Sequence, residues 1–340
     1  MKIIFCISNL FVPSSLSIIS ESDQEPIILY TNQEGIYQLI KKLALSNVIP
    51  FYHPEFHLKK NPAAIINYFK KRKAIYNKLT SFPISKVYFF HNSFGGLENW
   101  LIRKLSSTCE IYHIPTFNNL IGKKKYAFKA FKGLFISFLI NKAQVVPLWT
   151  GDIFIFKLSK SYFSDVCAQN LKIPINHTFL KKIVNDSFQI QEKSIILLTG
   201  TIVELNHVQK EEYITKIDCL IKELGPEKIS IKAHPRFSKE CYGLENNLVK
   251  IPSYVPANIL FSNFNIYIGY STSVLAEASN EGKIAISLLD LLNPIKEERK
   301  KWHKEYLKKN VEKGKIFFPR DISELSSIIL KKGICRPYEN

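Results

Sequence analysis

The sequence predicts an α/β fold built from two Rossmann-like domains that face a cleft. The chain has 340 residues, which is long for one compact core and suits two domains of ordinary size. In both halves, short apolar runs alternate with longer segments of helical periodicity, the pattern of parallel sheets covered by helices. A polar stretch at residues 185–193 separates the halves, so we place the domains at residues 1–190 and 191–340.

Each domain is expected to contain five buried strands. In the first half the strands are expected at residues 2–7, 26–30, 86–90, 109–114 and 144–148, and the helices at 33–44, 62–79, 97–106 and 123–142. In the second half the strands are expected at residues 194–198, 228–231, 248–251, 265–268 and 283–287, and the helices at 209–223, 257–262, 274–281 and 291–310. Ligands of such folds bind at the carboxyl ends of the strands, so the residues that follow each strand are the first candidates for a site.

The composition indicates an anionic partner and a reduced, cytosolic protein. The net charge is +18 and the isoelectric point is about 9.5, which fits nucleic acid, an acidic membrane surface or an acidic substrate. No RNP1, helix-turn-helix or zinc-finger pattern occurs, so nucleic-acid binding is the less favoured class. The six cysteines lack metal-ligand spacing. The apolar run at residues 3–7 is too short for a signal peptide, and we expect no membrane-spanning helix.

A basic motif follows one strand of the second half. Lys232, Ala233, His234, Pro235 and Arg236 come directly after the apolar run at residues 228–231. Proline disfavours the helical conformation for the residue before it, so His234 is held at the rim of the sheet. An imidazole N–H flanked by two cations can bind a phosphate. A basic surface loop is the alternative interpretation.

A hydroxyl-rich motif follows a second strand about 35 residues later. Gly269 and Tyr270 precede Ser271, Thr272 and Ser273, and a helical segment begins at residue 274. Hydroxyl groups at the start of a helix either cap it or bind an anion. Two strand ends suited to phosphate in one β/α series predict a nucleotide site, and two Rossmann-like domains with such a site indicate the GT-B architecture of glycosyltransferases.

Residues 194–290 resemble the donor-binding half of glycosyltransferase family 52, which includes bacterial lipooligosaccharide sialyltransferases. Related His-Pro and Ser/Thr motifs occur in bacterial polysialyltransferases. The similarity runs, in order and spacing, through residues 197–201, the helix at 211–223, residues 232–236, 251–258 and 271–273. Over the first half of the chain the similarity is only topological.

The resemblance implies a metal-independent, inverting transfer of sialic acid from CMP-sialic acid, without a cofactor. His234 would donate to the phosphate of the leaving CMP, and Ser271 and Thr272 would bind other phosphate oxygens. Gly200 would let the Thr201 amide approach the nucleotide. The donor-binding set is then Gly200, Thr201, Lys232, His234, Pro235, Arg236, Asn258, Ser271, Thr272 and Ser273.

Two residues depart from the family pattern. The relatives use a carboxylate base in an Asp/Glu-Asp/Glu-Gly motif, and no such tripeptide occurs here. Alignment of the strands by order places His113 there, and imidazole has the pKa nearest neutrality, so His113 is our first candidate for the base. A buried, hydrogen-bonded histidine is the alternative, and Asp152 is the second candidate. Asn258 stands where relatives often have Glu, which leaves the nucleotide and the sugar open.

The acceptor side rests on weaker signals. His91 and Asn92 follow the strand at residues 86–90, and Asn9 follows the first strand, so all three are candidates for acceptor binding. A cap for the helix after residue 96 is the alternative for the first two. A helix with lysines and a phenylalanine stripe at residues 123–142 predicts peripheral contact with an anionic membrane, although such a stripe also fits a protein core.

The favoured function is therefore a sialyltransferase-like enzyme that extends a bacterial surface glycan, such as lipooligosaccharide or capsule. We expect it at the cytoplasmic face of the inner membrane, with a glycan or glycolipid acceptor. A GT-B transferase that uses a UDP-hexose or another nucleotide sugar is the first alternative, and a basic nucleic-acid-binding protein is the second. The acceptor linkage and the oligomeric state, a homo-oligomer included, stay open.

Overall fold

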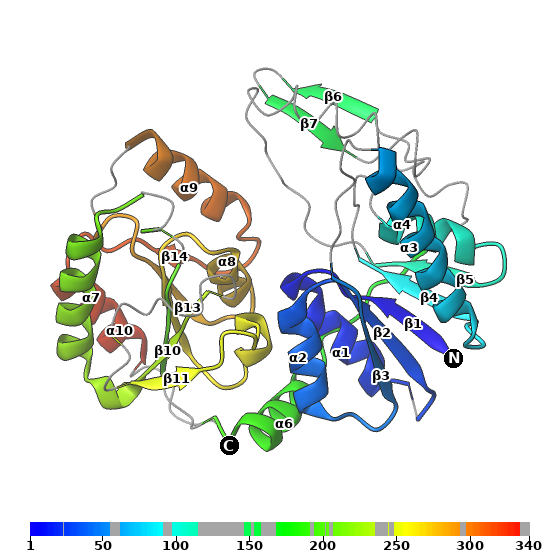
Figure 1. Ribbon diagram of the computed structural model, residues 1–340. Helices are drawn as coiled ribbons and strands as arrows, with labels where there is room; N and C mark the ends of the chain where they lie inside the picture. The colour runs from blue at the N-terminus through cyan, green and yellow to red at the C-terminus, as the bar shows by residue number, and fades with distance from the viewer. Residues whose placement is uncertain are drawn as a thin grey trace. The chain divides into compact units, whose positions relative to one another are not determined.

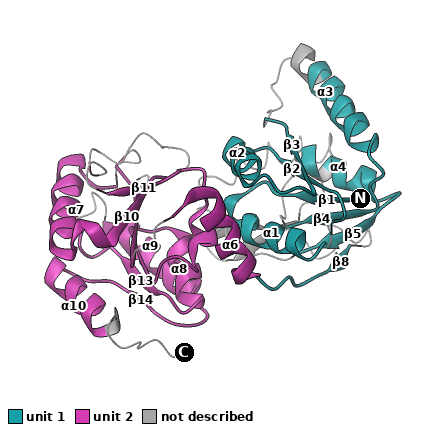
Figure 2. Ribbon diagram, turned by 90° about the horizontal axis from the view of Figure 1, so that it is seen from below, with its two compact units in different colours: residues 1–175 teal, residues 176–340 magenta. Residues whose placement is uncertain are grey.

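The computed structural model contains two compact units, Met1–Ile175 and Asn176–Asn340, which are described separately (Figures 1 and 2). The structure describes residues 1–22, 24–54, 62–90, 97–114, 146–150, 153–157, 168–190, 194–200, 202–203, 207–234, 244, 248–292 and 297–333. Within these residues, no helix is both long enough and apolar enough to cross a bilayer.

Unit 1 is built on a parallel six-stranded sheet in the order β3-β2-β1-β4-β5-β8. Its strands are β1 (Lys2–Phe5), β2 (Ile27–Thr31), β3 (Val48–Tyr52), β4 (Lys86–Phe89), β5 (Glu110–His113) and β8 (Gln169–Asn170). Its helices are α1 (Val12–Ser20), α2 (Glu34–Leu43), α3 (Pro62–Thr80) and α4 (Leu97–Leu105). A separate antiparallel pair consists of β6 (Val146–Thr150) and β7 (Ile153–Lys157).

The core of unit 1 explains why its strands are almost wholly apolar. Ile3 and Phe5 of β1 belong to one buried cluster with side chains of α3 and α4, such as Leu79 and Leu101. Ile4, between them, is also fully buried. Successive side chains of a strand point to opposite faces, so burial of all three requires that both faces of the sheet be covered.

Unit 2 repeats the same topology with the strand order β11-β10-β9-β12-β13-β14. Its strands are β9 (Ile195–Leu198), β10 (Ile229–Lys232), β11 (Val249–Ile251), β12 (Ile266–Gly269), β13 (Ile284–Ser287) and β14 (Ile316–Phe317). Its helices are α6 (His177–Phe188), α7 (Lys210–Leu224), α8 (Ser273–Asn280), α9 (Glu297–Lys309) and α10 (Ile322–Gly333), and α10 lies beside α7 (Figure 1). Both sheets therefore have the strand order 3-2-1-4-5-6 of a Rossmann fold, which confirms the predicted α/β class with two such units.

The division between the units differs from the predicted boundary after residue 190. The compact units divide at Ile175, so α6 belongs to unit 2. The reason is side-chain pairing that the sequence pattern does not reveal. Asn263 Nδ2 donates to Asn185 Oδ1 at 2.6 Å, and His177 Nε2 lies 3.1 Å from Glu281 Oε2.

Several elements differ from their predicted extents. The strands β3, β7, β8 and β14 were not predicted, and β3, β8 and β14 are edge strands of the two parallel sheets. The strand expected at residues 144–148 as part of the parallel sheet is β6, which pairs antiparallel with β7 instead. β3 contains Pro50, which an edge strand tolerates because it need not donate to a second neighbour. The segment predicted as a helix at residues 257–262 is the short 3-10 helix η6 (Ala257–Leu260). The predicted helix at residues 123–142 lies outside the described residues.

Candidate functional site

Three neighbouring strands of unit 2 bring the two predicted motifs to one edge of the sheet. Lys232 of β10 and Gly269 of β12 are both paired in register with Leu198 of β9. His234, Gly200 and Ser271 each lie two residues beyond these partners, at the carboxyl ends of adjacent strands. Adjacent strands are about 4.8 Å apart, so roughly 10 Å separates the outer two, a span that one phosphate can bridge between an imidazole and a hydroxyl.

The same edge is the topological switch point of unit 2. β9 and β12 are its first and fourth strands, and the chain leaves them toward α7 and α8. Ligands of open α/β sheets bind where the strand order reverses in this way. Gly200 and Ser271 flank this point, so the predicted donor residues occupy the position that the topology favours.

The three hydroxyls at the start of α8 have different roles. Thr272 is the N-cap residue, and its Oγ1 accepts a hydrogen bond from the Val274 amide at 3.3 Å. Ser273 hydrogen-bonds Glu277, one turn further along the helix. Ser271 Oγ makes no hydrogen bond with any other residue that the structure describes. Ser271 is therefore the hydroxyl that is available to a ligand, and Thr272 is used by the helix.

The two glycines of the site have different reasons to be glycine. A Cβ on Gly269 would lie 3.3 Å from Leu198 Cβ and from Thr272 Cγ2, so packing between β12, β9 and the cap requires a small residue. A Cβ on Gly200 would come no nearer than 3.4 Å to a described protein atom outside its neighbours, and its φ is not left-handed. The fold alone does not require glycine at position 200, which fits close approach of a ligand.

Lys232 holds the loop that carries His234. Its side chain is only 4% exposed, and Nζ donates to the carbonyl oxygens of Ala233 and Ser253 at 3.2 Å each. The ammonium group of Lys232, which the sequence predicted to bind a phosphate, therefore donates to backbone carbonyls instead. His234 is partly buried directly beyond this anchor. Thr201, Pro235 and Arg236 lie outside the described residues.

Glu277 is a candidate that the sequence analysis missed. Asn258 is 5% exposed, and its Nδ2 donates to Glu277 Oε2 at 3.1 Å. Burial raises the pKa of Glu277, while the hydrogen bonds from Asn258 and Ser273 oppose the rise. The Glu277 carboxylate, one helical turn after Ser273, can accept hydrogen bonds from sugar hydroxyls. The Glu277 carboxylate on α8 thus lies directly beside Asn258 of η6.

In unit 1, His113 lies at the carboxyl end of β5. Its Nδ1 is 3.1 Å from Asn170 Oδ1 on the paired strand β8, and its ring lies 4.8 Å from the Phe89 ring between centroids. Nε2 is buried. Burial lowers the pKa of His113, and the hydrogen bond with Asn170 opposes this shift. The neutral ring is held in one orientation, which suits a base as well as a structural histidine.

The other unit 1 candidates are only partly described. Asn9 begins a short 3-10 helix (Asn9–Phe11) after β1, capped by Ser8, whose Oγ accepts from the Leu10 amide at 3.4 Å. It lies at the switch point of this sheet, because β1 and β4 are its first and fourth strands. His91, Asn92 and Asp152 lie outside the described residues.

The basic run at residues 70–73 lies on α3 beside exposed apolar side chains. Ile66 is 58% exposed and Phe69 is 38% exposed. The Arg72 guanidinium lies over the rings of Trp100 and Phe69, 4.2 Å and 4.6 Å from their centroids. Such cation–π contacts fix Arg72 against the protein.

Neither a family model nor a curated protein matches the chain. Among solved structures, a UDP-N-acetylglucosamine 2-epimerase from Rickettsia bellii is 15% identical, with 84% of this chain and 78% of that one covered at a TM-score of 0.43. The ADP-heptose LPS heptosyltransferase II of E. coli is 11% identical, with 98% and 100% covered at 0.41. The wall teichoic acid polymerase TagF is 14% identical, with 97% and 79% covered at 0.49.

At these identities a likeness concerns the fold alone. Two Rossmann-type units in one chain, the components of the GT-B architecture, are established by the two sheets themselves. Membership of family 52 stays a prediction, as does the cleft between the units.

Proposed function

We propose that this chain is a glycosyltransferase that binds a nucleotide-sugar donor at the carboxyl ends of β9, β10 and β12. The observation that carries the proposal is the common register of Gly200, His234 and Ser271 at the switch point of unit 2. Gly200 leaves room for a phosphate, and His234 and Ser271 supply hydrogen-bond donors from either side. Three such groups on adjacent strands suit an anion better than a chance basic loop does.

The proposed chemistry is an inverting, metal-independent transfer. The bond between the anomeric carbon and the donor phosphate breaks, and the acceptor hydroxyl attacks the anomeric carbon from the opposite face. Negative charge grows on the departing phosphate, where the donors of His234 and Ser271 stabilise it most. A base in unit 1 accepts the proton of the acceptor hydroxyl, and His113 is our first candidate.

For the donor we propose CMP-sialic acid or a related acidic sugar. The support is the resemblance of residues 194–290 to family 52, together with a net charge of +18 that favours acidic substrates. The alternative is a UDP-hexose or another nucleotide sugar, which the replacement of a glutamate by Asn258 favours. Glu277 beside Asn258 offers either donor an acceptor for sugar hydroxyls.

For the acceptor we propose a glycan or glycolipid of a bacterial surface, such as lipooligosaccharide or capsule. The exposed Ile66 and Phe69, next to the lysines of the run at residues 70–73, support peripheral contact with an anionic membrane. We place this contact at the cytoplasmic face of the inner membrane, where a lipid-linked acceptor and a soluble donor meet.

A thermal-shift panel tests the proposed function. A ligand that binds only the native state raises the apparent stability of the protein, so CMP, UDP, GDP and their sugars can be compared on one scale. We expect a shift with CMP and CMP-sialic acid, and a larger shift with UDP would select the alternative donor. If none of the nucleotides shifts the transition while an oligonucleotide does so in a salt-dependent manner, the chain is a nucleic-acid-binding protein instead.

Ser271→Ala should weaken nucleotide binding without destabilising the protein. The Ser271 hydroxyl caps nothing in the described residues, and a hydrogen bond from a neutral donor to a charged phosphate is worth about 1.5–3 kcal/mol. We therefore expect the dissociation constant for the nucleotide to rise by about 10-fold or more. Isothermal titration calorimetry on the variant measures this directly.

Thr272→Ala is the matched control, since it removes a hydroxyl one residue away. Thr272 caps α8, so its loss should cost about 1 kcal/mol of stability and leave the dissociation constant nearly unchanged. Thr272→Ser keeps the cap and should restore the stability. If Thr272→Ala weakens binding while Ser271→Ala does not, the roles of the two hydroxyls are reversed.

A further inference from the structure

Three ring side chains from separate segments of unit 2 meet beside the proposed donor site. They are His207, from the segment between β9 and α7, Tyr270, directly after β12, and His303 of α9. The ring centroids lie 5.3 Å apart for His207 and His303, 6.1 Å for Tyr270 and His303, and 6.5 Å for His207 and Tyr270. We call these three residues the imidazole–tyrosine cluster. Tyr270 is the residue immediately before Ser271, so the cluster adjoins the phosphate-binding hydroxyl.

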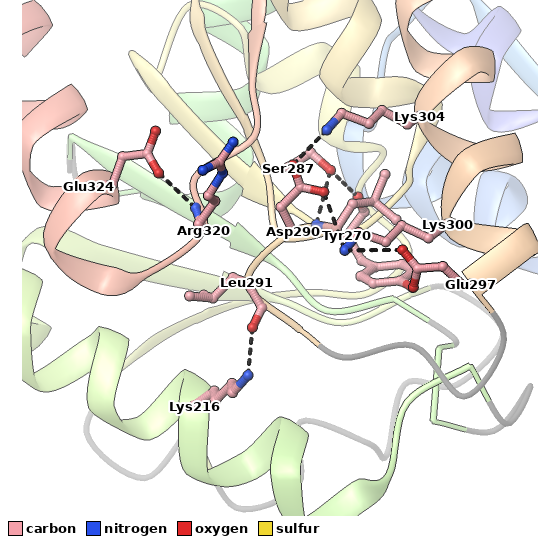
Figure 3. A network of polar contacts seen from close by, with 11 residues as sticks. Lys216, Tyr270, Ser287, Asp290, Leu291, Glu297, Lys300, Lys304, Arg320 and Glu324 are labelled. Atoms are coloured by element: carbon pink, nitrogen blue, oxygen red, sulfur yellow. Dashed lines mark hydrogen bonds and ion pairs between the residues drawn. The ribbon is translucent and has the colours of Figure 1, made fainter.

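The surrounding contacts hold the cluster in place. Ser287 Oγ donates to the Tyr270 carbonyl oxygen at 2.6 Å, and the Leu288 amide donates to the Gly269 carbonyl oxygen at 2.8 Å. Asp290, just after β13, binds α9 through Lys304 Nζ at 2.6 Å and Lys300 Nζ at 3.6 Å (Figure 3). These contacts fix both the backbone of Tyr270 and the first turns of the helix that carries His303.

Two polar atoms of the cluster are buried without a hydrogen-bond partner among the described residues. Tyr270 is 3% exposed, and neither its Oη nor Nδ1 of His207 forms a hydrogen bond with any described residue. A buried polar atom without a partner costs free energy, so native proteins rarely keep one without a purpose. The cluster thus has hydrogen-bonding groups to offer to a ligand.

The charges around the cluster indicate an anionic ligand. Arg299 of α9 lies close enough to lower the pKa of His207 and of His303, in each case in addition to burial. The pKa of His303 falls to about 4 through burial, then His207, then Arg299. Burial raises the pKa of Tyr270 to about 12, with Glu297 in the same direction and Arg299 against it, so its hydroxyl stays a donor.

Two lysines of α9 near the cluster are paired with carboxylates. Glu297 Oε1 lies 3.6 Å from Lys300 Nζ, and Lys300 and Lys304 both contact Asp290. The Arg299 guanidinium therefore adds positive charge beside the three rings. An oxyanion could accept a hydrogen bond from Tyr270 Oη and from an imidazole N–H, and its charge would favour the protonated form of the histidines.

We propose that His207, Tyr270 and His303 form a second anion subsite of unit 2, which binds an oxyanion of the substrate beyond the phosphate at Ser271. The group is either the second phosphate of a nucleoside diphosphate or the carboxylate of an acidic donor sugar. Both groups carry negatively charged oxygens that can accept hydrogen bonds from these side chains. The proposal rests on the proposed function, since it needs a phosphorylated donor at Ser271, and it adds a specificity element to that site.

Calorimetry with paired ligands tests the subsite. CMP and UMP carry one phosphate, UDP adds a second phosphate, and CMP-sialic acid adds a carboxylate. Wild-type protein should bind one of the two larger ligands about 10-fold or more tighter than its monophosphate, the effect of added hydrogen bonds to a charged group. An advantage of UDP over UMP that the cluster variants lose identifies a phosphate, and an advantage of CMP-sialic acid over CMP that the cluster variants lose identifies the acidic sugar.

Tyr270→Phe and His303→Gln should each abolish most of this advantage and leave the affinity for the monophosphate unchanged. Tyr267→Phe is the matched control. Tyr267 lies on β12 with its Oη also buried and without a described partner, but its ring packs on Phe261 and Phe264, away from the cluster. Removal of that hydroxyl should change neither affinity.

The pH dependence of binding distinguishes a ligand-binding role of His303 from a role in packing alone. Because the pKa of His303 is low in the free protein, an oxyanion that favours the imidazolium form raises it, and binding takes up a proton. The advantage of the larger ligand should grow as the pH falls from 7 toward 5, into the range between the raised pKa and the free value of about 4, in the wild type, and it should stay flat in His303→Gln. The binding enthalpy should depend on the ionisation enthalpy of the buffer only in the wild type.

The outcomes separate this inference from the proposed function. If the monophosphates bind and neither larger ligand gains affinity, the subsite proposal is wrong and the donor site stands. An equal loss of affinity for every ligand in Tyr270→Phe would show that the cluster only supports the Ser271 loop. If no nucleotide binds, the proposed function fails, and pyrophosphate against phosphate still tests the subsite: no difference between the variants and the wild type refutes it.

Discussion

His234→Ala is expected to lower the turnover of sugar transfer by about 100-fold or more while the protein stays folded, the usual effect of removing one preorganised donor to a developing charge. His234 lies beyond the last residue of β10, outside the buried core of unit 2. The loss should fall on kcat more than on KM, because the phosphate gains charge as its bond to the sugar breaks. Steady-state rates of donor consumption, together with thermal unfolding of the variant, measure both effects.

His177→Ala is the matched control in the same unit. His177 pairs with Glu281, which follows α8 just before β13 begins, at the amino ends of the strands and far along the sheet from the donor site. It should keep full turnover, whereas His234→Gln, which retains a side-chain N–H, should recover part of the loss. Unchanged turnover in folded His234→Ala protein would remove this residue from the donor site.

The shared position of His234 and Ser271 at one edge of the unit 2 sheet could be predicted from the sequence because the strands before them leave a plain signal. All four residues of β9 are buried, as are those of β10 and β12, so each strand reads as a short apolar run with a defined end. Parallel strands bring their carboxyl ends to one edge, and His234 and Ser271 follow such ends. That the two residues lie near each other then follows from the strand order of the Rossmann topology.

The partners of individual side chains could not be predicted in this way. Lys232 is a residue type that often binds phosphate, yet it is buried and donates to two backbone carbonyls. Glu277 is a helix residue of no special spacing, and its relation to Asn258 exists only once η6 packs on α8. His303 stands in a basic run that fits a solvated helix face equally well. Periodicity predicts which face a residue occupies, and tertiary contacts decide what it meets.

The edge strands and the boundary between the units could not be predicted from the sequence for a different reason. β8 consists of the polar residues Gln169 and Asn170, which pair with β5 alone among the described strands. Pairing on one side places little demand on apolar character, so short edge strands leave weak patterns. The start of unit 2 is likewise set by the polar contacts of α6, and these join residues about 80 positions apart.

His113→Ala is expected to slow transfer by about 100- to 10,000-fold and to leave donor binding intact, the usual contribution of a positioned general base. The pKa of His113 is lowered from its ordinary value of 6.5 by burial, so the ring is neutral at pH 7 and able to accept a proton. The rate of the wild type should therefore rise with pH through an apparent pKa below 6.5. Rates from pH 5 to 8 at saturating donor measure the profile.

Asn170→Asp distinguishes a base from a histidine that only packs. The new carboxylate would lie within hydrogen-bond distance of His113 Nδ1, now 3.1 Å from Asn170 Oδ1, and an adjacent negative charge raises the pKa of an imidazole. If His113 is the base, the rising limb of the rate profile should move upward by about one pH unit. Gln169→Asp is the control, because it adds the same charge on the opposite face of β8 and should shift the limb far less. The hypothesis fails if Asn170→Asp leaves the rate profile unchanged and His113→Ala keeps full activity. If Asp152→Ala is also inactive, then His113 is structural and Asp152 is the base.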